Sequence, residues 1–251
     1  MADAELFVAP VTARPGAARV VVVHGAMDRS TSFGRVARHL DDLEVVRYDR
    51  RGYGRSIEVG PGDLDDDVAD LLTVLDGRPS VVFGHSIGGV VAVVAAARRP
   101  DLVRSVLAYE APAPWAPWWP AGDGGEDRSP AEEAEAFMRR AIGDRLWGRL
   151  GSRTRDARRA EGPALLADLA SVQVGPPVDP ASVEVPVVVA SGSETSWWHA
   201  RAARELAADL PDARHRVVAG AAHGAHLSHP TATAALVREA VTLAPGPAEG
   251  R

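Results

Sequence analysis

The sequence predicts one doubly wound α/β domain with a mostly parallel sheet and a helical cap insertion. Short apolar runs rich in β-branched residues recur along the 251 residues, and most are separated by segments with the length and spacing of helices. This alternation is interrupted once, between about residues 111 and 181. Continuous apolar strands flanked by helices are typical of a parallel sheet that is buried on both faces, and the length suits one large domain.

Six apolar runs are the predicted strands. Each is short, and Gly, Pro or polar residues bound most of them. They are residues 20–23, 45–48, 81–83, 103–109, 187–190 and 214–218. Residues 5–12 predict one further strand at the amino end, although that stretch is short.

Five segments of the predicted core have helical spacing of their apolar residues. They are residues 32–40, 64–75, 88–98, 196–210 and 231–243.

The interruption predicts the cap. Four prolines and a Gly/Asp-rich loop precede helical segments at about 130–150 and 153–171, and a Pro/Gly cluster at 175–180 leads back to the sheet. We therefore expect residues 1–111 and 181–251 to form the core and residues 112–180 to form the cap. The tryptophans of the cap, together with a methionine after the first strand, are expected to line an apolar substrate pocket, unless each merely packs the cap onto the core. These pocket candidates are Met27, Trp115, Trp118, Trp119 and Trp147.

Composition narrows the function classes. The formal net charge of −6, with acidic and basic residues interspersed, gives no basic stripe for nucleic acid and no polybasic membrane patch. The amino end lacks the cationic region of a secretory signal, and the longest apolar run, 87–97, is too short to span a bilayer. We expect a cytoplasmic protein that acts on a small molecule without a metal or cofactor, and the sequence leaves its oligomeric state open. Without cysteine there is no disulfide and no thiolate.

The segment Gly84-His85-Ser86-Ile87-Gly88-Gly89 lies between a predicted strand and a predicted helix. A serine at such a sharp turn needs small residues two positions before and two positions after it, and Gly84 and Gly88 supply them. The helix that follows directs free backbone N–H groups toward developing negative charge. Ser86 is therefore the predicted nucleophile.

A serine hydroxyl needs a general base, and His223 is the predicted one. It follows the last predicted strand on a loop of small residues, which lets the loop approach the nucleophile closely. His226 and His229 are the competing candidates. Three other histidines, His39, His199 and His215, are expected to be solvated or to lie on a helix surface.

The acid that orients the base has two candidates. Glu110 ends the strand 103–109, where a buried carboxylate needs a cationic or hydrogen-bonded partner, such as a histidine that becomes protonated. Glu194 follows the next core strand and could instead cap the helix after it. We favour Glu110, and either residue keeps the chain order serine, acid, histidine.

Two backbone N–H groups are expected to bind the oxyanion of the reaction. One belongs to Ile87, directly after the nucleophile, and the other to Ala26, with Met27 as the next choice. His24 and Gly25, which precede them, are expected to shape the loop.

The motifs together resemble those of the α/β-hydrolase superfamily. His24-Gly25 after a strand, the segment Asp49 to Ser56 after the next, Gly84 to Gly89, and His223 seven residues before Pro230 occur in that family's order. The resemblance covers most of the chain outside the cap and implies a capped serine hydrolase of α/β-hydrolase fold. It also implies that the segment Asp49 to Ser56 is structural.

One departure from the family concerns the acid. Many members carry an aspartate three residues past a glycine like Gly192, where this chain has Thr195. A haloalkane-dehalogenase-like subgroup places its acid at the end of the strand after the nucleophile helix, and Glu110 is similar to that pattern. The dehalogenases and epoxide hydrolases of this fold attack with aspartate, so Ser86 argues against both activities.

The function expected is cleavage of an ester or related acyl bond of a small, largely apolar substrate through an acyl-enzyme on Ser86. A thioesterase, a lactonase or a carbon-carbon hydrolase could use the same residues. A receptor of this fold that binds a ligand without turning it over is the alternative from a different class.

Overall fold

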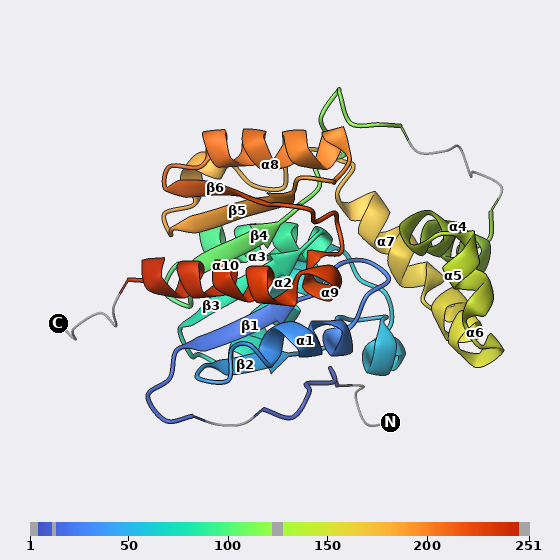
Figure 1. Ribbon diagram of the computed structural model, residues 1–251, viewed down its shortest axis with the longest axis horizontal. Coiled ribbons are helices and arrows are strands. Elements are labelled where there is room, and N and C mark those ends of the chain that lie inside the picture. The colour runs from blue at the N-terminus through green and yellow to red at the C-terminus, as the bar shows by residue number, and fades with distance from the viewer. Residues whose placement is uncertain (1–4, 12–13, 122–127, 246–251) are drawn as a thin grey trace.

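The computed structural model describes residues 5–11, 14–121 and 128–245. Within them six strands form one sheet in the order β2-β1-β3-β4-β5-β6, and every neighbouring pair is parallel (Figure 1). The strands are β1 Arg19–Val23, β2 Glu44–Arg47, β3 Ser80–His85, β4 Val103–Tyr109, β5 Val187–Gly192 and β6 Ala213–Val218. Their carboxyl ends meet at one edge of the sheet, which gathers the residues that follow them.

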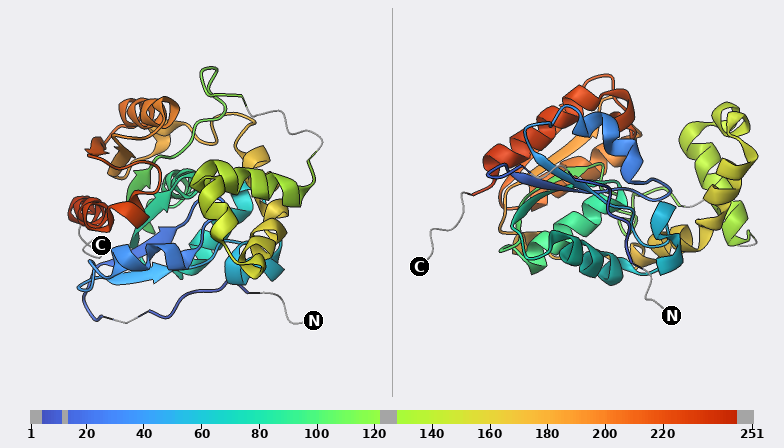
Figure 2. Two further views of the ribbon diagram at one scale, coloured as in Figure 1. Left: turned by 45° about the vertical axis from the view of Figure 1, so that its right-hand side comes forward. Right: turned by 90° about the horizontal axis from the view of Figure 1, so that it is seen from below.

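Helices cover both faces of the sheet. In the right-hand view of Figure 2, α1 and α10 lie on one side of the sheet and α2 and α3 on the other. In β1 the alternate residues Val20 and Val22 belong to the α1/α10 side, whereas Val21 and Val23 belong to the α2/α3 side, and all four are buried. The core helices and turns are η1 Ser30–Phe33, α1 Gly34–Ala37, η2 Gly54–Val59, α2 Leu64–Leu75, α3 Ile87–Arg98, η3 Pro180–Ser182, α8 Trp197–Asp209, α9 Ala225–Ser228 and α10 Pro230–Leu243.

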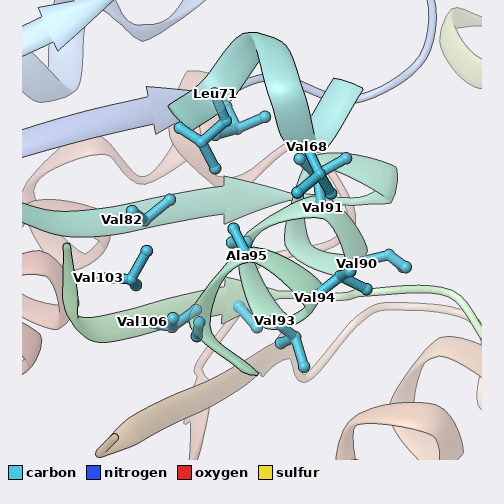
Figure 3. Packing of buried hydrophobic residues seen from close by; sticks show 14 of the residues in the cluster. Val68, Leu71, Val82, Val90, Val91, Val93, Val94, Ala95, Val103 and Val106 are labelled. Atoms are coloured by element: carbon cyan, nitrogen blue, oxygen red, sulfur yellow. The ribbon is translucent and has the colours of Figure 1, made fainter. Parts of the chain in front are cut away.

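Helix α3, which begins directly after Ser86, is deeply buried. All its residues from Ile87 to Ala96 are buried. Figure 3 shows its valines next to Val82 of β3 and Val106 of β4. A helix that is apolar on every side is typical of a protein interior, and this packing holds the start of α3 in place at the end of β3.

Between β4 and β5 the described residues form four helices, which lie as a separate group at one end of the molecule (Figures 1 and 2). They are α4 Pro130–Ile142, α5 Asp144–Arg149, α6 Ser152–Ala160 and α7 Gly162–Ser171. The sequence predicts two helical segments here, but each is divided in two. Gly143, at φ +80°, ends α4, because that backbone conformation suits glycine and not a helix. Gly162 allows α7 to approach the start of α4, since a Cβ there would lie 2.1 Å from the carbonyl oxygen of Pro130.

A buried ion cluster joins this group to the rest of the chain. The Arg50 guanidinium binds the carboxylates of Asp67 on α2 and Asp168 on α7, and the Tyr53 hydroxyl donates to Asp168 at 2.6 Å. Removing one partner of a buried pair leaves an uncompensated charge, which is costly. The boundaries 1–111, 112–180 and 181–251 between core and cap remain a prediction.

The other sequence predictions compare closely with these elements. The six strand predictions agree to within two residues, and the predicted helix 64–75 matches α2. The prediction of a strand over residues 5–12 is wrong for residues 5–11, because Val8 forms only an isolated antiparallel bridge with Tyr48. Residue 12 lies outside the described residues. The predicted helix 32–40 is shorter than expected, because a 3₁₀ turn precedes it and Gly34 weakens its start. Among the described helices none has both the length and the apolar character needed to cross a bilayer.

Candidate active site

Ser86 lies in the turn between β3 and α3. Its backbone is in the left-handed region, at φ +55°. A Cβ added at Gly84 would lie 2.2 Å from the Gly88 carbonyl oxygen, and one at Gly88 would lie 2.3 Å from the Val23 carbonyl oxygen. Both positions therefore require glycine, as the sequence predicts. The half-buried Ser86 is held at the carboxyl edge of the sheet, where its N–H donates to the Tyr109 carbonyl at 2.9 Å.

His223 and Glu110 meet at the same edge of the sheet. The Nδ1 atom of His223 lies 2.6 Å from Oε2 of Glu110. Glu110 is fully buried at the end of β4, whereas the His223 side chain is 40% exposed. Because Nδ1 faces the carboxylate, it carries the proton and leaves the lone pair of Nε2 available to act as a base.

Glu110 is stabilised as a carboxylate by three neighbours. Its Oε1 accepts the Gly192 N–H at 2.8 Å, and its Oε2 accepts the Thr195 hydroxyl at 2.9 Å in addition to His223. Burial alone would raise the pKa of Glu110, but these hydrogen bonds and the charge of a protonated His223 outweigh it and hold the pKa below its usual value. Glu110 is therefore charged near neutral pH.

The structure separates the two acid candidates. Glu194 is exposed, and its carboxylate accepts a 3.3 Å hydrogen bond from the adjacent Ser193 hydroxyl. Of the two, Glu110 is the one that contacts His223.

His85 connects the turn that holds Ser86 to the loop that holds His223. Its Nε2–H donates to the His223 carbonyl at 2.8 Å, and the two rings are 4.7 Å apart. Since His85 is the neighbour of Ser86 in the chain, this bond holds the loop of His223 next to the turn of Ser86.

The predicted oxyanion residues belong to two segments that border the Ser86 turn. Ile87 opens α3, so its N–H has no acceptor within the helix. Ala26 is half-buried in the loop after β1, and Gly25 before it touches the turn, because a Cβ at Gly25 would lie 2.9 Å from Ser86 Cβ. Met27 follows at φ +57°, and its carbonyl accepts the Arg158 guanidinium at 2.8 Å.

His24 makes hydrogen bonds that shape the loop after β1. The buried His24 accepts the Arg50 N–H at 2.8 Å and donates through Nδ1 to the Gly25 carbonyl at 2.7 Å. Burial lowers the pKa of His24 to about 4, so the ring is neutral at pH 7. Asp49 accepts the N–H groups of Ser30 and Arg55 at 2.7 and 2.9 Å. These contacts give the segment Asp49 to Ser56 a structural role.

His199 was expected to be solvated or on a helix surface, and this was wrong. Its half-buried ring stacks on His223 with centroids 4.5 Å apart, and Trp119 meets its other side edge-on at 5.2 Å. Its Nδ1 pairs with the Ser196 hydroxyl at 2.8 Å. Burial and, next, the charge of a protonated His223 lower the pKa of His199 to about 4.

The predicted pocket residues fall into two groups. Trp115 lines an apolar cavity of about 280 Å³ between α3 and α8, which neither Ser86 nor His223 lines. Trp118 donates at 3.0 Å to Glu205, which lines the same cavity. The Trp118 ring lies 6.0 Å from that of Trp119, which packs against His199.

Met27 and Trp147 lie elsewhere, in the apolar cluster that packs α4–α7 against the core. Trp147 is fully buried there and donates to Glu135 at 3.1 Å. Trp147 therefore has the alternative role considered for each tryptophan, which is to pack this group of helices onto the rest of the chain.

The competing base candidates lie apart from Glu110. His226 is buried against Phe33, with ring centroids 4.4 Å apart, and its Nε2 lies 3.2 Å from Asp28. His229 pairs with the neighbouring Ser228 hydroxyl at 2.9 Å.

Three residues around the site were missed as contributors, namely His85, Thr195 and His199. The sequence offered a signal for Thr195, since the family resemblance implies an acid at this position in many members. It offered none for the ring stacking of His199.

Comparison with known proteins identifies the family and the fold of the chain. The model of the family described as "Alpha/beta hydrolase family" matches residues 20–236. A lipase of Mycobacterium tuberculosis, LipV, is 39% identical over 95 residues, which are 37% of this chain and 36% of the relative. The matched stretch thus spans about a third of that protein.

Solved structures share the fold over nearly the whole chain. A hydrolase from Pseudomonas aeruginosa PA01 superposes with a TM-score of 0.74 at 20% identity and covers 94% of both chains. The enol-lactonase from Burkholderia xenovorans LB400 superposes with a TM-score of 0.71 at 21% identity and covers 94% of this chain and 96% of its own. At these identities the likeness establishes the fold alone.

Proposed function

Since the chain belongs to the alpha/beta hydrolase family, we propose that it is a serine hydrolase that cleaves an ester or related acyl bond through an acyl-enzyme on Ser86. The observation that carries the proposal is the 2.6 Å contact between His223 and the buried Glu110, at the sheet edge that also holds Ser86. A charged carboxylate, an imidazole with a free Nε2 and a serine in a strained turn are the parts of a nucleophilic triad.

In the first half of the reaction, His223 Nε2 takes the proton of the Ser86 hydroxyl as its Oγ bonds to the substrate carbonyl carbon. The carbonyl oxygen becomes an oxyanion, which the N–H groups of Ile87 and Ala26 bind. Glu110 stabilises the protonated His223, which then donates its proton to the leaving alcohol as the acyl-enzyme forms.

The second half repeats these steps with water. His223 takes a proton from water, whose oxygen bonds to the acyl carbon, and the proton is returned to Ser86 Oγ as the acid leaves. The carboxylate of Glu110 remains ionised throughout, because its three hydrogen-bond donors favour the charged form.

The proposed substrate is small and largely apolar. Aromatic rings lie next to the histidine of the triad, since His199 stacks on His223 and Trp119 packs against His199. In this proposal residues 112–180, with α4–α7, form a cap. The names of the relatives, a lipase and an enol-lactonase, fit acyl bonds of esters and lactones. Thioesters and carbon-carbon bonds remain alternatives on the same triad.

Covalent labelling tests the proposal. A fluorophosphonate should label the wild type once, on the peptide that contains Ser86, and Ser86→Ala should be neither labelled nor active against a panel of acyl esters, thioesters and lactones. Turnover that is unchanged in Ser86→Ala would refute the mechanism. Ligand-dependent thermal stabilisation without product, even at long incubation, would support a receptor instead.

A further inference from the structure

Three side chains that the proposed mechanism does not use as reactants lie together beside the triad. Asp28 comes from the loop after β1, His85 from the end of β3 and His226 from α9. One ring nitrogen from each imidazole and one oxygen of the carboxylate lie within 4.8 Å of one another. His226 Nε2 and Asp28 Oδ2 are only 3.2 Å apart.

The two histidines are buried with unused hydrogen-bonding capacity. His85 is 5% exposed and His226 is 3% exposed. Among the described residues, His85 Nδ1 and both ring nitrogens of His226 have no hydrogen-bond partner of acceptable geometry. Buried polar atoms are rarely left unpartnered, and each one costs free energy of folding. One unpartnered nitrogen on each ring is therefore available to donate a lone pair to an occupant beside the Asp28 carboxylate.

We propose that Asp28, His85 and His226 form a binding site for a divalent transition-metal ion, with Zn²⁺ as the best fit. The site is separate from the triad of Ser86, Glu110 and His223. The sequence predicts no metal, because its spacing does not show that these three residues meet.

The surroundings of His85 and Asp28 match those of metal ligands. Metal-bound histidines commonly donate their second ring N–H to a carbonyl, and His85 Nε2–H donates to the His223 carbonyl at 2.8 Å. Ligand carboxylates are themselves hydrogen-bonded, and Asp28 Oδ1 accepts the Arg29 N–H at 2.8 Å and the Ser32 hydroxyl. The free ring nitrogen of His85 is then Nδ1, one of the unpartnered atoms.

The donor set indicates which ions fit. Zn²⁺ binds nitrogen and oxygen at about 2.0–2.2 Å, so two ligands of a tetrahedral ion are about 3.3 Å apart. The pair formed by His226 and Asp28, at 3.2 Å, already has this separation. Two imidazoles suit Zn²⁺, Co²⁺ or Ni²⁺, whereas Ca²⁺ and Mg²⁺ prefer oxygen ligands alone. Water would complete the site as the fourth ligand on the side of Asp28, whose side chain is 16% exposed.

An ion here would join three segments that position the reacting groups. These are the loop after β1 that carries Ala26, the turn that carries Ser86 and the loop that carries His223. Because the ion binds the folded protein and not the unfolded chain, it would stabilise the fold.

A second group of ligating atoms must be distinguished from this site. Glu110, His199 and His223 also place ligand atoms within 4.8 Å of one another, but two of them are already paired within the triad. A metal that merely inhibits the reaction could act there. The experiment therefore measures binding directly and compares one variant from each group.

The experiment uses untagged protein freed of metal by chelation and titrated with Co²⁺. We expect one equivalent to give the strong visible absorption bands of four-coordinate Co²⁺. Zn²⁺ at a hundredfold excess over its Kd should raise the melting temperature of the wild type by about 5 °C or more. His226→Phe keeps a ring stacked on Phe33 but removes the ligand nitrogen, so the bands and the shift should be lost. His199→Gln should keep both.

Three results would overturn the proposal. They are a wild type without bands, bands that persist in His226→Phe, and bands that vanish in His199→Gln instead. Circular dichroism checks that His226→Phe is folded. If it is not, Asp28→Asn decides in its place, because it removes the charge of the carboxylate and weakens binding while keeping the side-chain shape.

Discussion

The Thr195 hydroxyl donates a 2.9 Å hydrogen bond to Oε2 of Glu110, the same oxygen that lies 2.6 Å from His223 Nδ1. Glu110 ends β4 and Thr195 follows β5, and these strands are neighbours in the sheet. The family resemblance of the sequence implies an acid after the strand equivalent to β5 in many members. In this protein the carboxylate reaches His223 from β4, and its charge is stabilised by the N–H of Gly192 at the end of β5 and by the Thr195 hydroxyl in the loop that follows.

Replacing each acid candidate by glutamine tests this arrangement. Glu110→Gln should lower kcat by about three to four orders of magnitude, because the amide no longer fixes the tautomer of His223 or stabilises its protonated form. Glu194→Gln, the matched control, should stay near the wild-type rate because its side chain is exposed. Steady-state kinetics on an activated ester measures both, and a loss confined to Glu194→Gln would assign the acid to that residue.

The contribution of Thr195 is expected to be smaller. Thr195→Val keeps the shape of the side chain but removes one donor to a charged carboxylate, which should reduce kcat about 10- to 100-fold. Thr195→Ser should restore most of the rate. Thr242→Val is a suitable control, since its exposed hydroxyl bonds only to the Arg238 carbonyl of its own helix. Equal rates in Thr195→Val and wild type would mean that the hydrogen bond does not support the acid.

Replacing glycine by alanine at two positions should change the free energy of unfolding in opposite directions. Gly84→Ala forces a Cβ to 2.2 Å from the Gly88 carbonyl oxygen, so we expect a loss of about 3 kcal/mol or more in the free energy of unfolding. Gly148→Ala lies in α5 with nothing within 4 Å of the added Cβ and should gain about 0.5–1 kcal/mol. Urea denaturation followed by circular dichroism gives both values. A neutral Gly84→Ala would contradict the close contact of β3 with α3.

The buried setting of His199 predicts a pH dependence of stability. Its pKa is lowered from 6.5 to about 4 in the folded protein, so the unfolded chain binds more protons between these values. The stability that the neutral His199 ring contributes is fully present above pH 6.5 and is lost as the pH falls toward 4. Allowing for its half-buried position, the change is about 2 kcal/mol.

His199→Gln should flatten the curve of unfolding free energy against pH between 6.5 and 4. The exposed His39→Gln should leave the slope as in the wild type. Denaturation at a series of pH values provides the measurement, and identical slopes for wild type and His199→Gln would show that the ring titrates normally.

The strands and the turn that holds Ser86 could be predicted because their signals in the sequence are local. The buried strands are continuous β-branched runs, and Gly84 and Gly88 are required by backbone contacts within a few residues of Ser86 or with the adjacent strand. The sequence did not predict the breaks between α4 and α5 and between α6 and α7. Gly143 acts through its backbone angle and Gly162 through a contact with another helix.

The sequence by itself determined the fold class, the strand positions and the setting of Ser86, because hydrophobic periodicity and glycine placement act over short stretches of chain. Only the tertiary structure decided which carboxylate contacts His223, that His199 stacks on it, and that Asp28, His85 and His226 meet. Those contacts join residues up to about two hundred positions apart. They depend on the order of strands in the sheet and on loop conformation, which no local pattern encodes.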